Sequence, residues 1–113
     1  MNVFFDIQGT LVSGGVPRPH ARETFAEILG SGHEIYLWSS AGSSYASAAA
    51  KMLGVEDLIS GCYSKSGPLP VNVDFAVDDQ PFLVDLHGGY AITPFNGDPA
   101  DTALHKVTQV LRG

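Results

Sequence analysis

Short apolar runs alternate with amphipathic stretches from the second residue of this chain onward, and no other feature constrains its fold as strongly. Four runs read as strands and a fifth as an edge strand, namely Asn2–Phe5, Glu34–Trp38, Val73–Val77, the weaker Tyr90–Ile92, and Ile59–Tyr63 at the edge. Largely apolar runs without strict alternation suit strands that are covered on both faces. The pattern therefore predicts an α/β fold with a central parallel sheet and right-handed crossovers.

Amphipathic spacing predicts four helices between and after these strands. The first has an apolar face over 21–29 and ends at Gly30, and the second has an apolar face over 45–53 with Ser43 or Ser44 as its N-cap. The third begins with Pro81 at its first helical position. The last begins at Asp98-Pro99 and carries the apolar residues Leu104, Val107 and Leu111. Between the first strand and the first helix, Ser13–Pro19 is the most loop-like segment of the chain.

Length and composition narrow the possible roles. A chain of 113 residues is too short for a second independent core, so we expect one domain over residues 1–113. A net charge of −6 argues against a nucleic-acid partner. Cys62 is the only cysteine, which excludes an intrachain disulfide and favours a reducing compartment. Without a signal peptide or a run of ~18 apolar residues, we expect a soluble cytoplasmic protein with no membrane partner.

Polar clusters follow three of the predicted strands. Asp6 is followed by Gln8 and Thr10, the second strand runs into Ser39-Ser40, and the third into Asp78-Asp79. Because the carboxyl ends of parallel strands share one edge of the sheet, these side chains are expected to meet in one pocket. Carboxylates so close together repel one another unless a cation lies among them. A hard ion with oxygen ligands, typically Mg²⁺, is the expected cofactor.

Four segments resemble, in order, the motifs of the haloacid-dehalogenase-like (HAD) superfamily. Phe4–Val12 is similar to its first motif, an apolar strand followed by Asp-x-Asp-Gly-Thr-Leu/Val. Ile35–Ser40 resembles the second, Lys65 is the best match to the lysine of the third, and Phe75–Asp79 resembles the fourth. Shorter matches around Arg18-Pro19-His20 are similar to the small phosphatases related to the RNA-polymerase C-terminal-domain phosphatases. The resemblance implies a three-layer Rossmann-like fold without a cap domain.

The resemblance also implies roles for individual residues. Asp6 would be the nucleophile that forms an aspartyl-phosphate, and Lys65 would pair with it and with the phosphate. The implied residues are, for catalysis, Asp6, Gln8 and Lys65; for substrate binding, Thr10, Ser39, Ser40 and Lys65; and for Mg²⁺, Asp6, the carbonyl of Gln8, Asp79, and Asp78 beside it. The expected partner is a phosphorylated substrate, either a small molecule or a phosphoprotein.

Gln8 is the main departure from the family pattern, which has an acidic residue there as general acid and base. An amide cannot exchange a proton at ordinary pH, and general acid–base catalysis typically contributes ~10²–10⁴-fold. Two interpretations stay open: an enzyme with slow turnover, or a degenerate module that binds metal or phosphate. Dehalogenase activity is a third, disfavoured by the Asp-rich site.

Several remaining features complete the prediction. The segments Ser13–Pro19 and Ser60–Val71 are too short for a cap, so the substrate is macromolecular or a second subunit closes the site. Arg18 reads as a loop charge or a substrate contact. The four histidines, which show no metal-ligand spacing, read as surface or loop residues. Lys51 is a weaker rival of Lys65, because it lies within a predicted helix.

Overall fold

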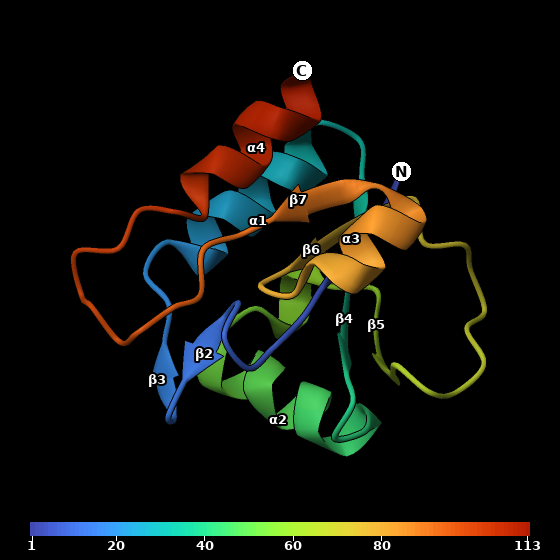
Figure 1. The fold of residues 1–113 in the computed structure, drawn as a ribbon, viewed down its shortest axis with the longest axis horizontal. Coiled ribbons are helices and arrows are strands. Elements are labelled where there is room, and N and C mark those ends of the chain that lie inside the picture. The colour runs from blue at the N-terminus through green and yellow to red at the C-terminus, as the bar shows by residue number, and fades with distance from the viewer.

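A computed structural model describes all 113 residues and confirms an α/β fold with a parallel sheet. Five strands pair in the order β5-β4-β1-β6-β7, with β1 central (Figure 1). They are β1 (Asn2–Phe5), β4 (Glu34–Ser39), β5 (Gly61–Ser64), β6 (Phe75–Asp78) and β7 (Gly89–Ala91). The helices are α1 (Ala21–Gly30), α2 (Ser43–Leu53), the 3₁₀ turn η1 (Glu56–Leu58), α3 (Pro81–His87) and α4 (His105–Arg112). None of them combines the length and the apolar composition needed to cross a membrane.

The sheet is covered on both faces, because successive side chains of a strand point to opposite sides. Val3 and Phe5 belong to the larger core, which also contains apolar residues of α1, α2 and α4. Phe4, between them, belongs to a separate cluster against which Leu83 of α3 packs. Three layers result, with α1, α2 and α4 on one face and α3 on the other, as in a Rossmann-like fold without a cap domain.

The segment Ser13–Pro19, expected as a loop, takes part in a short antiparallel hairpin. Its strands are β2 (Val12–Ser13) and β3 (Val16–Pro17). Gly14 and Gly15 join them with φ values of 54° and 79°, the positive values that a two-residue type I′ turn requires. The hairpin is too small to form a further layer over the sheet.

The last helix begins at His105, and the expected start at Asp98-Pro99 is wrong. The carboxylates of Asp98 and Asp101 each accept a hydrogen bond from the backbone N–H two residues further on, both at 2.9 Å. Such local turns compete with helical hydrogen bonds and keep this segment irregular. Sequence periodicity could not detect this, because the apolar spacing of the true helix extends back into the turns.

The second helix also starts differently from the expectation. Its N-cap is Gly42, with a φ of 106°, so neither Ser43 nor Ser44 caps it. The remaining helix and strand ends agree with the expected ones within two residues. Shifts of that size are common wherever ends are assigned.

Arg18 lies in the loop between β3 and α1, as one interpretation expected, but it is buried, at 2% exposure, and does not line the acidic cavity. Its guanidinium donates to the two carboxylate oxygens of Asp101 at 2.9 and 3.0 Å. It also donates to the backbone carbonyls of Thr10, at 3.1 Å, and Thr93, at 2.8 Å. The planar fork of donors lets one side chain satisfy all of these acceptors. Arg18 therefore ties the connection between β7 and α4 to the loop that follows β1.

Replacing Arg18 with alanine should destabilise the protein strongly. The substitution removes four hydrogen bonds at once and leaves Asp101 without its cation, so we expect the free energy of unfolding to fall by about 3–5 kcal/mol. Chemical denaturation followed by circular dichroism measures the change. Arg22→Ala is the matched control, since its pair with Asp57 lies on the surface and contributes little. Equal losses for the two variants would contradict the role given to Arg18.

Candidate active site

The strand order creates a crevice between β1 and β6. The chain leaves β1 toward α1 on one face and leaves β6 toward α3 on the other, so the two segments diverge at the carboxyl ends of the strands. Ligands of open α/β sheets bind at such a switch point. The register pairs Phe5 with Val77, so Asp6 and Asp78 follow side by side. The expected meeting of these two strand ends is confirmed.

Lys65 reaches the same crevice from the other side of β1. Ser39 of β4 pairs with Ser64 of β5, which places the next residue, Lys65, at this edge of the sheet. Its Nζ donates to Asp6 Oδ1 at 2.8 Å and to Asp78 Oδ2 at 2.9 Å. The ammonium therefore bridges carboxylates from two neighbouring strands. Lys51, its weaker rival in the sequence, is exposed on α2.

The loop after β1 supports the carboxylates from behind. Thr10 is fully buried, and its hydroxyl donates to Asp6 Oδ2 at 3.1 Å and accepts the N–H of Asp79 at 3.1 Å. Gly9 has a φ of 86°, and a side chain there would collide with the Asp79 carboxylate. Thr10 does not line the cavity, which corrects its assignment to substrate binding: its hydroxyl is already committed to the two acidic residues.

The two acidic residues after β6 have different surroundings. Asp78 is 2% exposed and uses both oxygens, Oδ2 for Lys65 and Oδ1 for the N–H of Gln80 at 2.9 Å. Asp79 is partly exposed, and its carboxylate has only a long contact of 3.5 Å from the Thr10 hydroxyl. Asp79 is therefore the freer of the two to bind a ligand, while Asp78 orients Lys65 and the turn into α3.

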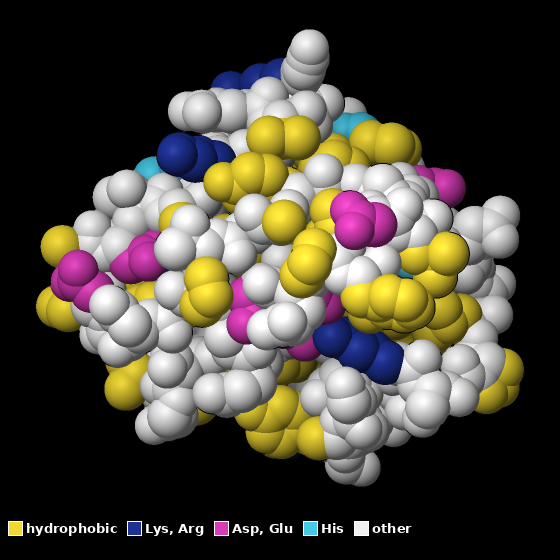
Figure 2. All heavy atoms as spheres, in the orientation of Figure 1, with side chains coloured by type: hydrophobic (Ala, Val, Ile, Leu, Met, Phe, Trp, Pro, Cys, Tyr) yellow, Lys and Arg dark blue, Asp and Glu magenta, His cyan; other side chains and the backbone are white.

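A cavity of about 450 Å³ opens over these groups. It is lined by Asp6, Gln8, Ser39, Ser40, Ala41, Tyr45, Lys65, Asp78, Asp79 and Gln80. Figure 2 shows acidic side chains partly recessed beside a basic one, on the part of this face between α3 and α2. Apart from Thr10, the structure thus brings every site residue predicted from the sequence to one cavity.

Two polar side chains shape the mouth of the cavity. Ser39 Oγ accepts a hydrogen bond from the N–H of Ala41 at 3.0 Å, which holds the loop after β4. The hydroxyl of Tyr45, on α2, donates to Gln8 Oε1 at 3.2 Å and fixes the amide at the opening. The sequence placed Tyr45 on the apolar face of α2, and both Tyr45 and Gln80 lie in segments that resemble the small phosphatases, but neither residue was assigned to the cavity. Their place in the cavity follows from how α2 and α3 pack.

Burial dominates the electrostatics of Asp6. Removal from water raises its pKa from 3.8 to about 6, because the hydrogen bond and charge of Lys65 only partly offset the desolvation, and the negative charge of Asp78 adds to the rise. Burial alone would lower the pKa of Lys65, but its hydrogen bonds to Asp6 and Asp78 outweigh that effect and raise it. Lys65 is therefore charged at neutral pH.

The donor set fits a hard divalent cation. One carboxylate oxygen from each of Asp6, Asp78 and Asp79 lies within 4.8 Å of the other two. Three carboxylates and one ammonium leave an excess of two negative charges, which a divalent ion would balance. The backbone carbonyl of Gln8 accepts no hydrogen bond from the chain's backbone or side chains, so it is available as a fourth oxygen ligand.

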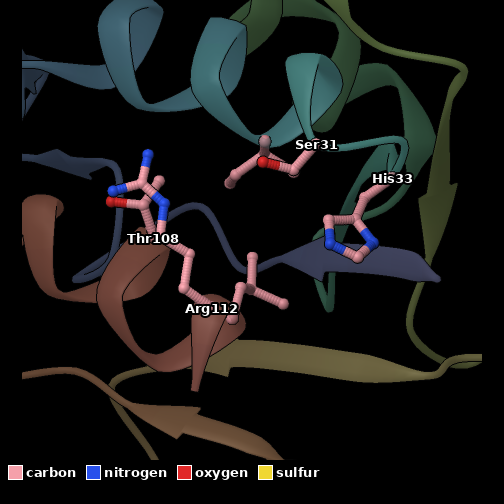
Figure 3. A pocket seen from close by; sticks show the side chains of 6 residues that line it. Ser31, His33, Thr108 and Arg112 are labelled. Carbon is pink, nitrogen blue, oxygen red and sulfur yellow. The ribbon is translucent and has the colours of Figure 1, made fainter.

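A second cavity, of about 210 Å³, lies between α1 and α4 (Figure 3). Ser31 and His33 enter it from the end of α1 and the turn after it, and Thr108 and Arg112 enter it from α4. It has no carboxylate and shares no residue with the acidic cavity. This cavity therefore lacks the acidic groups that gather at the switch point.

No protein-family model matches this chain, and no curated protein matches it significantly.

The raised pKa of Asp6 predicts a distinctive pH dependence of stability. The folded state binds the Asp6 proton more tightly than the unfolded state, so this group stabilises the fold most below about pH 4, and the contribution is lost as the pH rises through about 6. Without divalent metal, the unfolding free energy of the natural protein minus that of Asp6→Asn should fall by on the order of 2 kcal/mol between pH 4 and pH 7. Thermal or urea unfolding of both proteins across this range measures the difference, and parallel curves would contradict the raised pKa.

Proposed function

We propose that this chain is a Mg²⁺-dependent phosphatase or phosphoryl-transfer enzyme of the HAD superfamily that acts through an aspartyl-phosphate on Asp6. One observation carries the proposal: Asp6, with Lys65 hydrogen-bonded to it, lies within metal-binding distance of Asp78 and Asp79 in an open cavity at the switch point. A carboxylate, a fixed cation and a divalent-ion site together match the needs of phosphoryl transfer.

The reaction has two steps. A carboxylate oxygen of Asp6 attacks the phosphorus of a phosphomonoester, the bond from phosphorus to the leaving oxygen breaks, and that oxygen takes a proton from water. A second water then attacks the phosphorus of the acyl phosphate, the bond from phosphorus to the Asp6 oxygen breaks, and the proton that this water loses neutralises the hydroxide left by the first step, so that Asp6 is restored and phosphate is released. Splitting hydrolysis in this way replaces one difficult displacement by two easier ones.

The surrounding residues have distinct tasks in these steps. Lys65 holds Asp6 in place and supplies positive charge where negative charge develops on the phosphoryl oxygens. The Ser39 hydroxyl can donate a hydrogen bond to the same oxygens, whereas the N–H groups of Ala41 and Gly42 are already bonded to Ser39. Thr10 fixes the orientation of the Asp6 carboxylate from behind. Mg²⁺, held by Asp6, Asp79 and the Gln8 carbonyl, would neutralise charge on the phosphate and keep Asp6 ionised.

Gln8 sets the expected rate. Its side chain lies at the cavity, where a general acid would protonate the leaving group, but an amide held by Tyr45 can only orient water or the leaving oxygen. We therefore propose slow turnover, with a long-lived aspartyl-phosphate. The same observation favours a second candidate, a regulatory module that binds metal and phosphate without turning them over.

The open cavity affects which phosphorylated substrates could reach Asp6. No cap covers the carboxyl ends of the strands, so a phosphate on a large molecule such as a phosphoprotein could reach Asp6, as could a small phosphorylated molecule. A second copy of the chain closing the opening would exclude water and is the alternative arrangement.

Substitutions at Asp6 and Gln8 separate the enzyme from the binding module. With a generic aryl phosphate and Mg²⁺, we expect weak hydrolysis by the natural protein, none by Asp6→Asn, and an increase of about 100-fold or more in Gln8→Asp, because a carboxyl group can transfer the proton that an amide cannot. Beryllium fluoride, a mimic of the phosphorylated carboxylate, should bind the natural protein and not Asp6→Asn. Absence of metal-dependent turnover in both the natural protein and Gln8→Asp would favour the binding module.

The two lysines offer a matched test of charge at the cavity. Lys65→Met keeps the aliphatic stem but removes the ammonium that contacts Asp6, so we expect the rate to fall by at least about 100-fold. Lys51→Met removes a similar charge from the exposed side of α2 and should leave the rate within about twofold. Steady-state assays on folded samples, checked by circular dichroism, compare the two. A similar rate in both variants would exclude Lys65 from the reaction.

A further inference from the structure

A cluster of metal-ligating side chains lies outside the acidic cavity, where the starts of α1 and α4 meet. It consists of His20, Glu23 and His105, each of which offers one ligand atom within 4.8 Å of the other two. His20 immediately precedes α1, Glu23 lies in the first turn of α1, and His105 is the first residue of α4. The helices pack against each other, which brings the two distant histidines together (Figure 1).

The three side chains already face one another closely. His20 Nδ1 lies 3.0 Å from Glu23 Oε1, and the rings of His20 and His105 have centroids 4.4 Å apart. A tetrahedral zinc ion, with bonds of about 2.0–2.1 Å, separates its ligand atoms by about 3.3 Å. Closing the remaining distance requires rotation of these side chains, which are exposed or half-buried. The fourth position would be open to water, because the cluster is only partly buried.

We propose that His20, Glu23 and His105 form a binding site for Zn²⁺ or a similar transition-metal ion that joins the start of α4 to the start of α1. Two imidazoles and one carboxylate are the ligand types that such ions select, whereas Mg²⁺ prefers a set made of oxygens. This site is therefore chemically distinct from the acidic cavity, and its ion would not exchange freely with the one at Asp6.

Electrostatics around the cluster favour a bound cation. The carboxylate of Glu23, 3.0 Å from His20 Nδ1, supplies a negative charge within the cluster itself. Asp101 is also close enough to His20 for their charges to interact. Its carboxylate is held by Arg18, however, so Asp101 adds negative charge nearby without serving as a ligand.

The position of the cluster indicates a structural role. The connection between β7 and α4 contains no helix or strand, and it is held by Arg18 and by a hydrogen bond from the Phe95 N–H to the Gly9 carbonyl at 2.8 Å. An ion at His105 would fasten the far end of this connection to α1. The metal would thereby stabilise the segment that supports the loop after β1.

Zinc titration by calorimetry, in the presence of excess Mg²⁺ to occupy the acidic cavity, tests the site. We expect one zinc ion per chain, with affinity at least about tenfold weaker in His105→Ala, Glu23→Gln and His20→Asn. Asparagine is chosen at position 20 because His20 has a φ of 72°, which asparagine tolerates. At a free zinc concentration about 100 times the dissociation constant, the unfolding temperature should rise by on the order of 10 °C.

Two control variants show where the ion binds. His33→Ala removes a histidine that contacts the N-terminus, and Asp79→Asn alters the acidic cavity; both should retain zinc affinity. Cobalt in place of zinc should give the visible absorption of a four-coordinate ion in these controls and lose it in His105→Ala. Unchanged zinc affinity in both His20→Asn and His105→Ala would overturn the proposal, as would loss of binding in Asp79→Asn alone.

Discussion

The ammonium of Lys65 between the carboxylates of Asp6 and Asp78 is the interaction on which the site depends. It joins residues from three strand ends, β1, β5 and β6, that diverge into different layers. Without this charge, buried carboxylates side by side would repel one another and could not stay ionised. The single charge of Lys65 is shared by two carboxylates, so it only partly offsets the cost of burying Asp6, and the pKa of Asp6 stays raised. An excess of negative charge remains, which a metal ion would balance.

This arrangement trades stability for chemistry. A protein built only for stability would not bury Asp6 beside Asp78 and Asp79, and strain of this kind is typical of functional sites. Behind the cluster, Thr10 and the positive φ of Gly9 bring the backbone close to Asp79. The opening of the cavity, in contrast, has no cap domain. It carries the amide of Gln8 at the position where the proposed reaction would use an acidic group to transfer a proton. Under the proposed function, such a site would hold phosphate but release it slowly, which fits slow turnover or a regulatory role.

Arg18 links this site to the C-terminal part of the chain. One end of its guanidinium donates to the carbonyl of Thr10, the residue after Gly9, and the other donates to Asp101 and the carbonyl of Thr93. The connection between β7 and α4 therefore supports the loop after β1, although the connection contains no helix or strand.

The parallel α/β architecture and most of the acidic cavity can be predicted from residue patterns, because strand periodicity is local and the carboxyl ends of parallel strands necessarily share an edge. Asp6, Ser39 and Asp78 could be placed from those facts alone. Other features depend on residues that are distant in the chain and are seen only in the folded protein. They are the pairing of buried Arg18 with Asp101, the hydrogen bond from Thr10 to Asp6, the start of α4, and the contact of His105 with His20. Such contacts depend on how the layers pack, and no local pattern of residues records that packing.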